Sequence, residues 1–544
     1  MTSHPPPTPI SDSGDDGNAG NAGDAASAGN APAATLDLPL EHSYAELPER
    51  FYSRTPPTPV AEPRLLEFNG PLAEELGLDP ELLTSPEGVR VLAGNAVPHG
   101  VHPIAMAYGG HQFGGWVPQL GDGRAILLGE VVDRAGVRRD LQLKGAGRTP
   151  WSRRGDGRSS LGPVVREYLG SEAMAALGIP TTRALAAVST GERVLRQNGP
   201  EPGGVMTRVA TSHVRVGTFE YFARQGDHAA VERLADYVIR RHYPHLAEDE
   251  VPARGLLDAV IGRTAELVAA WLSVGFIHGV MNTDNTSVVG ETLDFGPFGF
   301  LDPFRPEEVY SFIDRSGRYA YGQQPGIAHW NLARFAETLL TLLAPEPEEA
   351  LEVATGILDT FPGRFQAAWH RRLARKIGLA GAGGNAAGGD GAAEAGTEVD
   401  DRAAELAEDL LARMAKEEAD FTLTFRELSR LSATDPSGDE PVRRLFGDPA
   451  AFDGWATSWR ARLAAEGRDD ATRRREMLAT NPAFILRNHL AQAAVDAAVE
   501  RLDLAPARRL LRVLARPFDD QPGEEDLQRP PEAAERVTTT FCGT

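Results

Sequence analysis

Residues 278–302 read HGVMNTDNTSVVGETLDFGPFGFLD and carry Asp284, Asn285 and Asp294 inside an apolar frame. An Asn and an Asp can hold a hard divalent cation through their oxygens. In many ATP-dependent phosphotransferases the pattern H-x-D-x-x-x-x-N is followed by D-F-G, and the catalytic base is the Asp of the first pattern. When that pattern is aligned with HGVMNTDN, its Asn coincides with Asn285, and the position of its catalytic Asp is occupied by Val280. The stretch keeps the metal ligands of such enzymes and lacks their usual base.

Upstream, a hairpin is predicted by the pattern of glycine and apolar residues. The sequence LGDGRAILLGEVVD, residues 120–133, indicates a glycine-rich turn and an apolar strand. The sequence DLQLK alternates as a second strand that ends on Lys144. The chain therefore presents a lysine on the second arm of a hairpin.

Two helices are predicted further along. Residues 163–178 begin with a proline and end with a glycine, which favours a helix that carries Glu167 and Glu172. Residues 255–275 place apolar side chains on one helical face and lead directly into the opening stretch. A long buried helix would thus deliver the Asp284–Asn285 pair.

These signals follow the order of parts in the protein-kinase fold, which is a glycine loop, a strand lysine, a helical glutamate, a long helix, an Asn and then Asp-Phe-Gly. Glycines let backbone N–H groups approach phosphates, the lysine neutralises them, and the glutamate orients the lysine. Each part also has a plain structural reading, because Asp-Phe-Gly and Gly-Asp-Gly form ordinary turns and a strand lysine is often solvated. The shared order favours an α+β, two-lobed protein-kinase-like fold with a β-rich N-lobe, a mainly helical C-lobe and a helical C-terminal extension.

Composition narrows the function classes. A formal net charge of -22 argues against nucleic-acid partners and against anionic membranes, so any phosphate recognition must be local. No basic segment followed by an apolar run stands at the N-terminus, and the apolar stretch around Leu267 to Met281 reads as a buried helix. Cys542 is the single cysteine, so no disulfide can form within the chain. We expect a cytoplasmic protein.

Low-complexity segments suggest the domain boundaries, because they lack the large apolar side chains of a packed core. We expect a disordered tail at 1–35, an N-lobe at 36–205, a C-lobe with the catalytic and metal site at 206–377, a low-complexity linker at 378–401, a helical C-terminal part of the C-lobe at 402–530, and a tail with Cys542 at 531–544.

Three long stretches resemble one known family. YGGHQFGGWVPQLGDGRA (108–125), LQLKGAGRTPWSRRGDGRSSLGPVVREYLGSEAMAALGIPTTRAL (141–185) and GVMNTDNTSVVGETLDFGPFGFLD (279–302) closely resemble the selenoprotein O family, also called YdiU. The resemblance covers about residues 40–377 and continues to the C-terminal FCGT. The family is similar to kinases in fold and is described as transferring AMP from ATP to protein hydroxyl side chains, with the nucleotide in a flipped orientation. The resemblance implies a protein adenylyltransferase, and it leaves UTP open as a second donor, for UMP transfer.

The resemblance also implies a set of nucleotide contacts. They are Gly121, Gly123 and Arg124 in the glycine turn, Lys144 on the strand, Asp156 and Gly157 in RRGDGR, and Arg208 and Arg215 in TRVATSHVRVGTFE. Glu167 is the family's match for the partner of the lysine, and Glu172 stays open as the alternative. The span also concentrates arginines whose guanidinium groups suit phosphate oxygens: Arg148, Arg153, Arg154, Arg158 and Arg166. For Arg148 and Arg153, pairing with surface carboxylates is the alternative.

The same resemblance supplies the missing base. The family uses the position of Asp284, so this carboxylate would accept the proton of the attacking hydroxyl. Asn285 and Asp294 would hold Mg²⁺ or Mn²⁺ against the ATP phosphates. The structural alternative for Asp284 is a turn residue that caps nearby N–H groups.

Three function classes remain: a protein adenylyltransferase acting on Ser, Thr or Tyr hydroxyls, a kinase-type phosphotransferase, and a nucleotide-binding pseudokinase scaffold. The metal ligands disfavour a scaffold and Val280 disfavours an ordinary kinase. His111 and Gln112 are markers of the family to which we assign no chemistry from the sequence. Cys542 stands where eukaryotic relatives carry selenocysteine, although a thiol in a polar tail is usually just exposed.

Overall fold

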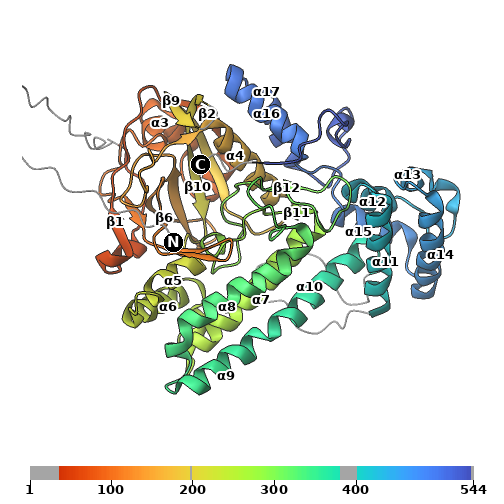
Figure 1. Ribbon diagram of the computed structural model, residues 1–544. Coiled ribbons are helices and arrows are strands. Elements are labelled where there is room, and N and C mark those ends of the chain that lie inside the picture. Colours follow the sequence, from red (N-terminus) through yellow and green to blue (C-terminus); the bar gives the residue numbers. More distant parts are fainter. Residues whose placement is uncertain (1–35, 197–198, 380–400, 541–544) are drawn as a thin grey trace, which may run out of the picture.

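The computed structural model describes residues 36–196, 199–379 and 401–540. Of the segments expected to lack a packed core, residues 1–35, residues 380–400 of the linker and the tail residue Cys542 lie outside this description. The fold is mixed α+β, with an antiparallel sheet in the N-terminal half and mostly helices in the C-terminal half (Figure 1). At that level the expected fold class is confirmed.

The strands are β1 (Tyr52–Arg54), β2 (Arg64–Phe68), β3 (Ile104–Met106), β4 (Gly110–Gln112), β5 (Gly115–Val117), β6 (Ala125–Val132), β7 (Arg138–Lys144), β8 (Ser159–Ser160), β9 (Arg183–Arg196), β10 (Gly199–Ala210), β11 (Phe276–Ile277) and β12 (Gly299–Phe300). The helices of the first half are α1 (Gly70–Glu75), α2 (Pro80–Thr84), α3 (Pro86–Leu92), α4 (Leu161–Ala176), α5 (Val216–Ala223), α6 (His228–His242) and α7 (Pro252–Ser273). Those of the second half are α8 (Gln324–Leu343), α9 (Pro347–Leu358), α10 (Thr360–Lys376), α11 (Asp401–Glu417), α12 (Phe421–Leu428), α13 (Glu440–Arg443), α14 (Pro449–Glu466), α15 (Asp470–Thr480), α16 (Asn488–Arg501) and α17 (Ala505–Leu514).

The main sheet has the strand order β1-β3-β6-β7-β10-β9-β2, with β8 paired to β10. The predicted hairpin is confirmed, because β6 and β7 pair antiparallel with Ala125 opposite Lys144. In the neighbouring pair, Arg208 of β10 stands opposite Gln142 of β7. Since side chains two residues apart share a face, this register puts Lys144 and Arg208 on the same face of the sheet. The expected boundary between residues 205 and 206 falls inside β10.

Helix α4 packs against β9 and β10 and begins two residues before the predicted start at Pro163. Ser160 is its N-cap residue, and the helix ends just before Gly178, which has a φ of +75°. Most of its side chains are buried, including Glu167. The helix therefore carries a carboxylate into the interior beside the sheet.

Helix α7 is the predicted long buried helix, and all seven side chains of its expected apolar face are buried: Leu257, Val260, Ile261, Thr264, Leu267, Val268 and Trp271. It leads into β11, which pairs antiparallel with β12. The pairing of Phe276 with Phe300 closes residues 278–298 into a loop whose two ends lie side by side. Aromatic contacts among Phe276, Phe295 and Phe298 fix the base of that loop.

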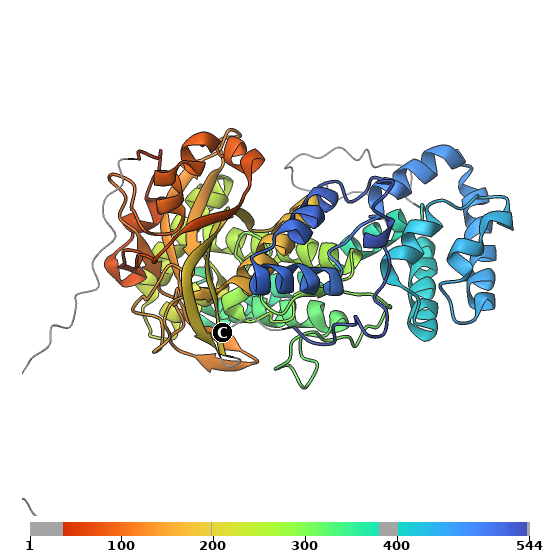
Figure 2. The same cartoon turned by 90° about the horizontal axis from the view of Figure 1, so that it is seen from above.

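The C-terminal helices form two groups. Helices α11 to α15 share a second core with the end of α10, and α11 begins the part of the chain that we expected to be helical, residues 402–530. Helices α16 and α17 return to the N-terminal half and pack against α4 (Figures 1 and 2). The return is fixed by Arg487, whose guanidinium lies 2.6 Å from Asp302 and 2.9 Å from Asp420.

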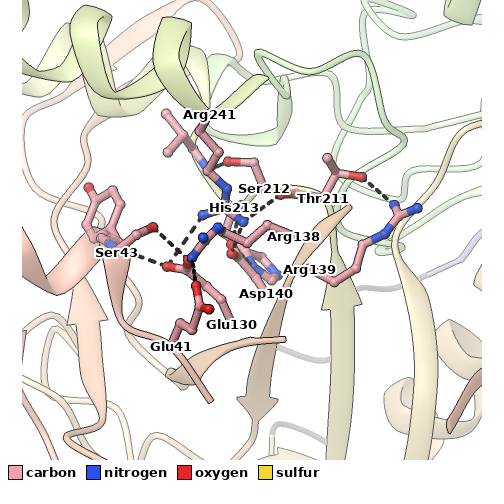
Figure 3. A network of polar contacts seen from close by, with 12 residues as sticks. Glu41, Ser43, Glu130, Arg138, Arg139, Asp140, Thr211, Ser212, His213 and Arg241 are labelled. Atoms are coloured by element: carbon pink, nitrogen blue, oxygen red, sulfur yellow. Dashed lines mark hydrogen bonds and ion pairs between the residues drawn. The ribbon is translucent and has the colours of Figure 1, made fainter. Parts of the chain in front are cut away.

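A buried polar network joins the sheet to helix α6 (Figure 3). Asp140 on β7 accepts hydrogen bonds from Arg241 of α6 at 2.6 Å and from His213 Nδ1 at 3.0 Å. Nearby, Glu130 on β6 accepts a 2.6 Å hydrogen bond from Ser43. Because His213 lies two residues before Arg215, the network fixes the segment that leads from the sheet to that arginine.

Among the described residues, no helix is both long enough and apolar enough to cross a membrane.

Candidate functional site

A cleft of about 860 Å³ lies between the loops of the sheet and the loop of residues 278–298. Every site residue expected from the sequence lines it except Glu167: Gly121, Gly123, Arg124, Lys144, Asp156, Gly157, Arg208, Arg215, Asp284, Asn285 and Asp294. Glu167 stands behind the lining and contacts two of its members. Residues from four distant stretches of the chain are thus brought to one cavity.

An ion-pair cluster forms one wall of the cleft. Lys144 Nζ lies 2.5 Å from Glu167 Oε2 and 2.5 Å from Asp294 Oδ1. Arg208 donates to Glu167 at 2.9 Å through Nε and to Asp294 at 3.0 Å through Nη2. Burial alone would raise the pKa of Asp294, but the charges of Lys144, Arg208 and Arg124 outweigh it and hold the pKa well below its usual range.

Glu172, the alternative partner for Lys144, faces elsewhere. It accepts hydrogen bonds from Arg183 at 3.0 and 2.8 Å and from Asn69 at 2.8 Å. The choice between the two glutamates is settled by helix geometry, because positions five apart lie on different faces of α4.

Asp284 also lines the cleft and lies in a short 3₁₀ turn at Thr283–Asn285. Its Oδ2 accepts a 3.1 Å hydrogen bond from Gln112, whereas its buried Oδ1 has no hydrogen-bond partner among the described residues. Arg215 donates to the backbone oxygen of Asp284 at 3.0 Å. Burial raises the pKa of Asp284 to about 7, and the Gln112 hydrogen bond and Arg215 oppose that rise only in part.

The two expected metal ligands, Asn285 and Asp294, both line the cleft. Asn285 donates its Nδ2 to Val280 O at 3.1 Å, which leaves Oδ1 as the atom that could bind a cation. Asp294 has a φ of +67°, an uncommon conformation for an Asp, and its side chain is 30% exposed. Both of its ion pairs use Oδ1. Among the described residues, no three His, Cys, Asp or Glu side chains are placed to hold a metal ion together.

The glycine turn owes its shape to a neighbouring tryptophan as well as to its own backbone. Gly121 has a φ of +60°, and a Cβ there would come within 2.3 Å of the Trp151 ring. A Cβ on Gly123 would stand 3.0 Å from Trp151 O. At the rim, Gly157 has a φ of +67° and a Cβ on it would come within 2.1 Å of Gly147 O. No L side chain fits at Gly121 or Gly157 without movement of the chain.

The arginines of the expected cationic span divide between the cleft and the interior. Arg153, Arg154 and Arg158 line the cleft. Arg166 does not, because its buried guanidinium lies over the Phe298 ring and donates to Phe298 O at 2.7 Å. Arg148 donates to Gly155 O at 2.9 Å instead of joining a surface carboxylate.

Several lining residues were not expected as site residues from the sequence. Tyr108 stacks under the Arg215 guanidinium at 4.2 Å from its ring centroid, and Phe113 stands exposed at the rim. Gln112 belongs to a motif to which we assigned no chemistry, yet it holds the Asp284 carboxylate. No local pattern signals that contact, since the two residues lie 172 positions apart.

Comparisons with known proteins give one consistent family. The family model described as "Protein adenylyltransferase SelO" matches residues 34–515. A "Protein nucleotidyltransferase YdiU" of Alkalilimnicola ehrlichii is 59% identical over 506 residues, which cover 93% of this chain and 99% of that protein. Proteins of the same name from Rhodopseudomonas palustris (strain BisB5) and Bradyrhizobium sp. (strain ORS 278) are 56% and 57% identical, and each match covers 94% of this chain and 100% of the relative.

The family match and these relatives define the chain as an enzyme of the nucleotidyltransferase class. The chain belongs to the SelO family of protein adenylyltransferases, also called YdiU.

Proposed function

We propose that this enzyme transfers AMP from ATP to Ser, Thr or Tyr hydroxyls of proteins, itself included, with Asp284 as the general base. The observation that carries the proposal is the pairing, in one cleft, of a cationic cluster around Lys144 with the buried carboxylate of Asp284. The two groups have different chemical roles. Cations hold polyphosphate, and an unpaired carboxylate oxygen accepts a proton.

Asp284 suits the base role because of its environment. A general base works best when its pKa is near the working pH, and burial raises the pKa of this carboxyl to about 7. Among the described residues its Oδ1 has no hydrogen-bond partner, so the carboxylate retains the capacity to accept a proton. A turn residue that only capped N–H groups would accept from neighbouring backbone, whereas the hydrogen bond to this carboxylate comes from the distant side chain of Gln112, which favours the base over the structural alternative.

Lys144, Arg208, Arg124 and Arg215 would bind and orient the triphosphate. Glu167 already holds Lys144 and Arg208 in place, so little rearrangement is required when the phosphates arrive. Gly121 and Gly123 would bring the backbone of the glycine turn close to the nucleotide, and Asp156 and Gly157 would close the rim.

The residues present also fit a divalent cation. Asn285 has a free amide oxygen and Asp294 has a second carboxylate oxygen outside its ion pairs. Two protein ligands are few, but Mg²⁺ commonly takes one or two from protein and the rest from phosphate and water. Mg²⁺ or Mn²⁺ held there would supply positive charge to the phosphates.

We further propose that the chain has two kinase-like lobes, with residues 36–205 as the N-lobe and residues 206–377 as the C-lobe. The strand lysine, its helical glutamate, the long helix α7 and the Asp-Phe-Gly turn support this reading. Because β10 crosses position 205, the sheet extends a few residues into the segment we assign to the C-lobe. Residues 402–530 would then complete the C-lobe from outside.

Two other functions stay open to test. A kinase would transfer the terminal phosphate. However, Val280, which lines the cleft, occupies the sequence position at which the kinase pattern has its catalytic Asp. A scaffold would only bind nucleotide, which leaves the buried Asp284 without a purpose. UTP is the alternative donor, and UMP would then be the transferred group.

The test is to incubate the purified protein separately with ATP labelled at the α- or the γ-phosphate, and to measure the label that stays on protein. We expect α-label from the wild type. Asp284→Asn should lower that labelling by at least about a hundredfold, because loss of a general base costs about 10² to 10⁴ in rate. The same variant should keep the thermal stabilisation that ATP and Mg²⁺ give the wild type.

Asp496→Asn is the matched control, since this exposed carboxylate on α16 accepts a hydrogen bond from Gln492, does not line the cleft, and should leave labelling unchanged. Label only from γ-ATP would make the protein a kinase, and no label from either would make it a scaffold. Full activity in Asp284→Asn would remove the base from the mechanism.

A further inference from the structure

A small hairpin outside the main sheet lies against the catalytic turn. It is formed by β4 and β5, within the sequence GGHQFGGWV of residues 109–117, and pairs His111 with Trp116. It contacts helix α5 and the turn that holds Asp284. The transfer reaction as proposed gives this hairpin no role.

Glycines allow the hairpin to approach so closely. A Cβ on Gly110 would stand 3.0 Å from Asp284 Oδ1 and 3.0 Å from Thr283 Oγ1. From the other side, a Cβ on Gly217 of α5 would come within 2.3 Å of Gly109 O. The backbone of the hairpin is thus in direct contact with the side chain of the base, with no room for another residue type.

His111 anchors the hairpin through a buried three-residue contact. Its Nδ1 lies 2.5 Å from Glu220 Oε1, and its backbone N donates to Thr283 Oγ1 at 2.7 Å. Thr283 in turn donates to the other oxygen of Glu220. Because Thr283 precedes Asp284, the anchor fixes the hairpin and the catalytic turn to the same carboxylate of α5.

Gln112 follows this anchor and reaches the base. Its Nε2 donates to Asp284 Oδ2 at 3.1 Å, the one side-chain hydrogen bond that the carboxylate accepts from the described residues. A carboxylate held at one oxygen cannot rotate freely about its last torsion, so the Gln112 contact fixes the orientation of the Asp284 carboxylate beside the hairpin. We propose that Gln112 is a positioning residue for the transfer reaction, and that His111 and Glu220 anchor it.

The inference rests on the proposed function of Asp284 but concerns a different residue. Gln112 sets the orientation of the Asp284 carboxylate and is not expected to hold the phosphates, so its loss should lower the rate without weakening ATP binding. Misdirection of a reacting group by a fraction of an ångström to an ångström can cost one to two orders of magnitude in rate.

The test variant is Gln112→Met, which keeps the length of the side chain and removes the donor. We expect the maximal rate of self-labelling from α-labelled ATP to fall about tenfold or more. The ATP concentration for half-maximal rate and the thermal unfolding midpoint should stay at the wild-type values. Gln225→Met is the control, because Gln225 is exposed and its amide donates only to Tyr221 O.

A second measurement separates positioning from general support of the fold. If Gln112 acts through Asp284, then Gln112→Met should add no further loss in an Asp284→Asn background. An equal loss in both backgrounds, weakened ATP binding, or a wild-type rate in Gln112→Met would each overturn the inference.

The labelling experiments also distinguish a failure of the proposed function from a failure of the role assigned to Gln112. Wild-type protein that transfers γ-phosphate in place of AMP would refute the proposed function, and the rate comparison would still decide the role of Gln112. Absence of any transfer by the wild type would overturn both.

Discussion

At the scale of single residues, strained backbone is concentrated around the cleft. Four of the non-glycine residues with positive φ line it: Phe113 at 51°, Arg153 at 47°, Arg154 at 73° and Asp294 at 67°. Such conformations persist only where the surrounding structure enforces them, and they gather at functional sites. Phe113 illustrates the enforcement, since its N–H lies 3.1 Å from Asn282 Oδ1 and 3.2 Å from Tyr319 Oη.

The glycine turn allows a matched test of the same idea. Gly121→Ala should lower activity at least about tenfold and weaken stabilisation by ATP, because its Cβ would overlap the Trp151 ring and displace the turn. Gly136→Ala has a similar backbone, with a φ of +80°, but nothing lies within 4 Å of its Cβ. It should cost about 1 kcal/mol of stability and leave activity unchanged. Equal activity losses in the two variants would mean that strain alone, and not the contact with Trp151, is responsible.

The sequence predicted the residues whose signals are local. Lys144 ends an alternating strand after a glycine turn, and Glu167 lies on a helix with clear start and stop signals. Gln112 could not be found in that way, because its importance depends on a fold that brings it to Asp284. Arg166 shows the opposite failure, since a cationic span in the sequence does not say which guanidinium turns inward to Phe298.

At the scale of elements, helix α10 ends on a buried lysine. The Lys376 ammonium lies 4.2 Å from the centroid of the Phe425 ring and 5.3 Å from that of Phe421, both on α12. The rings attract the cation but do not replace its water, and burial lowers the pKa of Lys376 to about 7. Loss of hydration is the cause of the shift, and among the described residues no charged side chain opposes it.

This pKa gives a stability that depends on pH. Between pH 7 and about 10.4, the unfolded chain binds a proton here that the folded chain has released, so stability rises with pH across that window. Lys376→Met should therefore unfold at a higher temperature than wild type at pH 7 and below, and the gain should shrink toward pH 10. Lys416→Met, at an exposed position of α11, should show no such trend. A gain for Lys376→Met that is the same at every pH would show that the buried lysine stays charged.

Helices and strands were predicted correctly where the spacing of apolar residues determines the secondary structure. Helices α4, α7 and α11 and the hairpin of β6 and β7 follow from apolar spacing and from glycine and proline positions. The short β4–β5 hairpin is nearly devoid of apolar alternation, so pattern reasoning passes over it. The return of α16 and α17 to α4 is a tertiary contact between distant parts of the chain, which no local pattern encodes.

At the scale of the whole molecule, the cleft depends on helices that contribute nothing to its lining. Ala494 of α16 is fully buried in the main core, whereas its neighbour Ala493 is exposed. Ala494→Glu should lower the thermal unfolding midpoint and reduce labelling, because an unpaired buried charge costs about 3 kcal/mol or more. Ala493→Glu introduces the same side chain on the solvent side and should change neither. Full activity in a destabilised Ala494→Glu would show that α16 supports the fold but not the cleft.

The return of α16 and α17 also bears on when the enzyme becomes active during its own synthesis. The strand with Lys144 and the helix with Glu167 leave the ribosome well before α16 and α17, the helices that pack against α4. Until then α4 has an uncovered apolar surface and the lysine–glutamate pair lacks its support. We therefore expect a nascent chain to be a poor catalyst until α16 and α17 have been made, even after all its cleft residues have emerged.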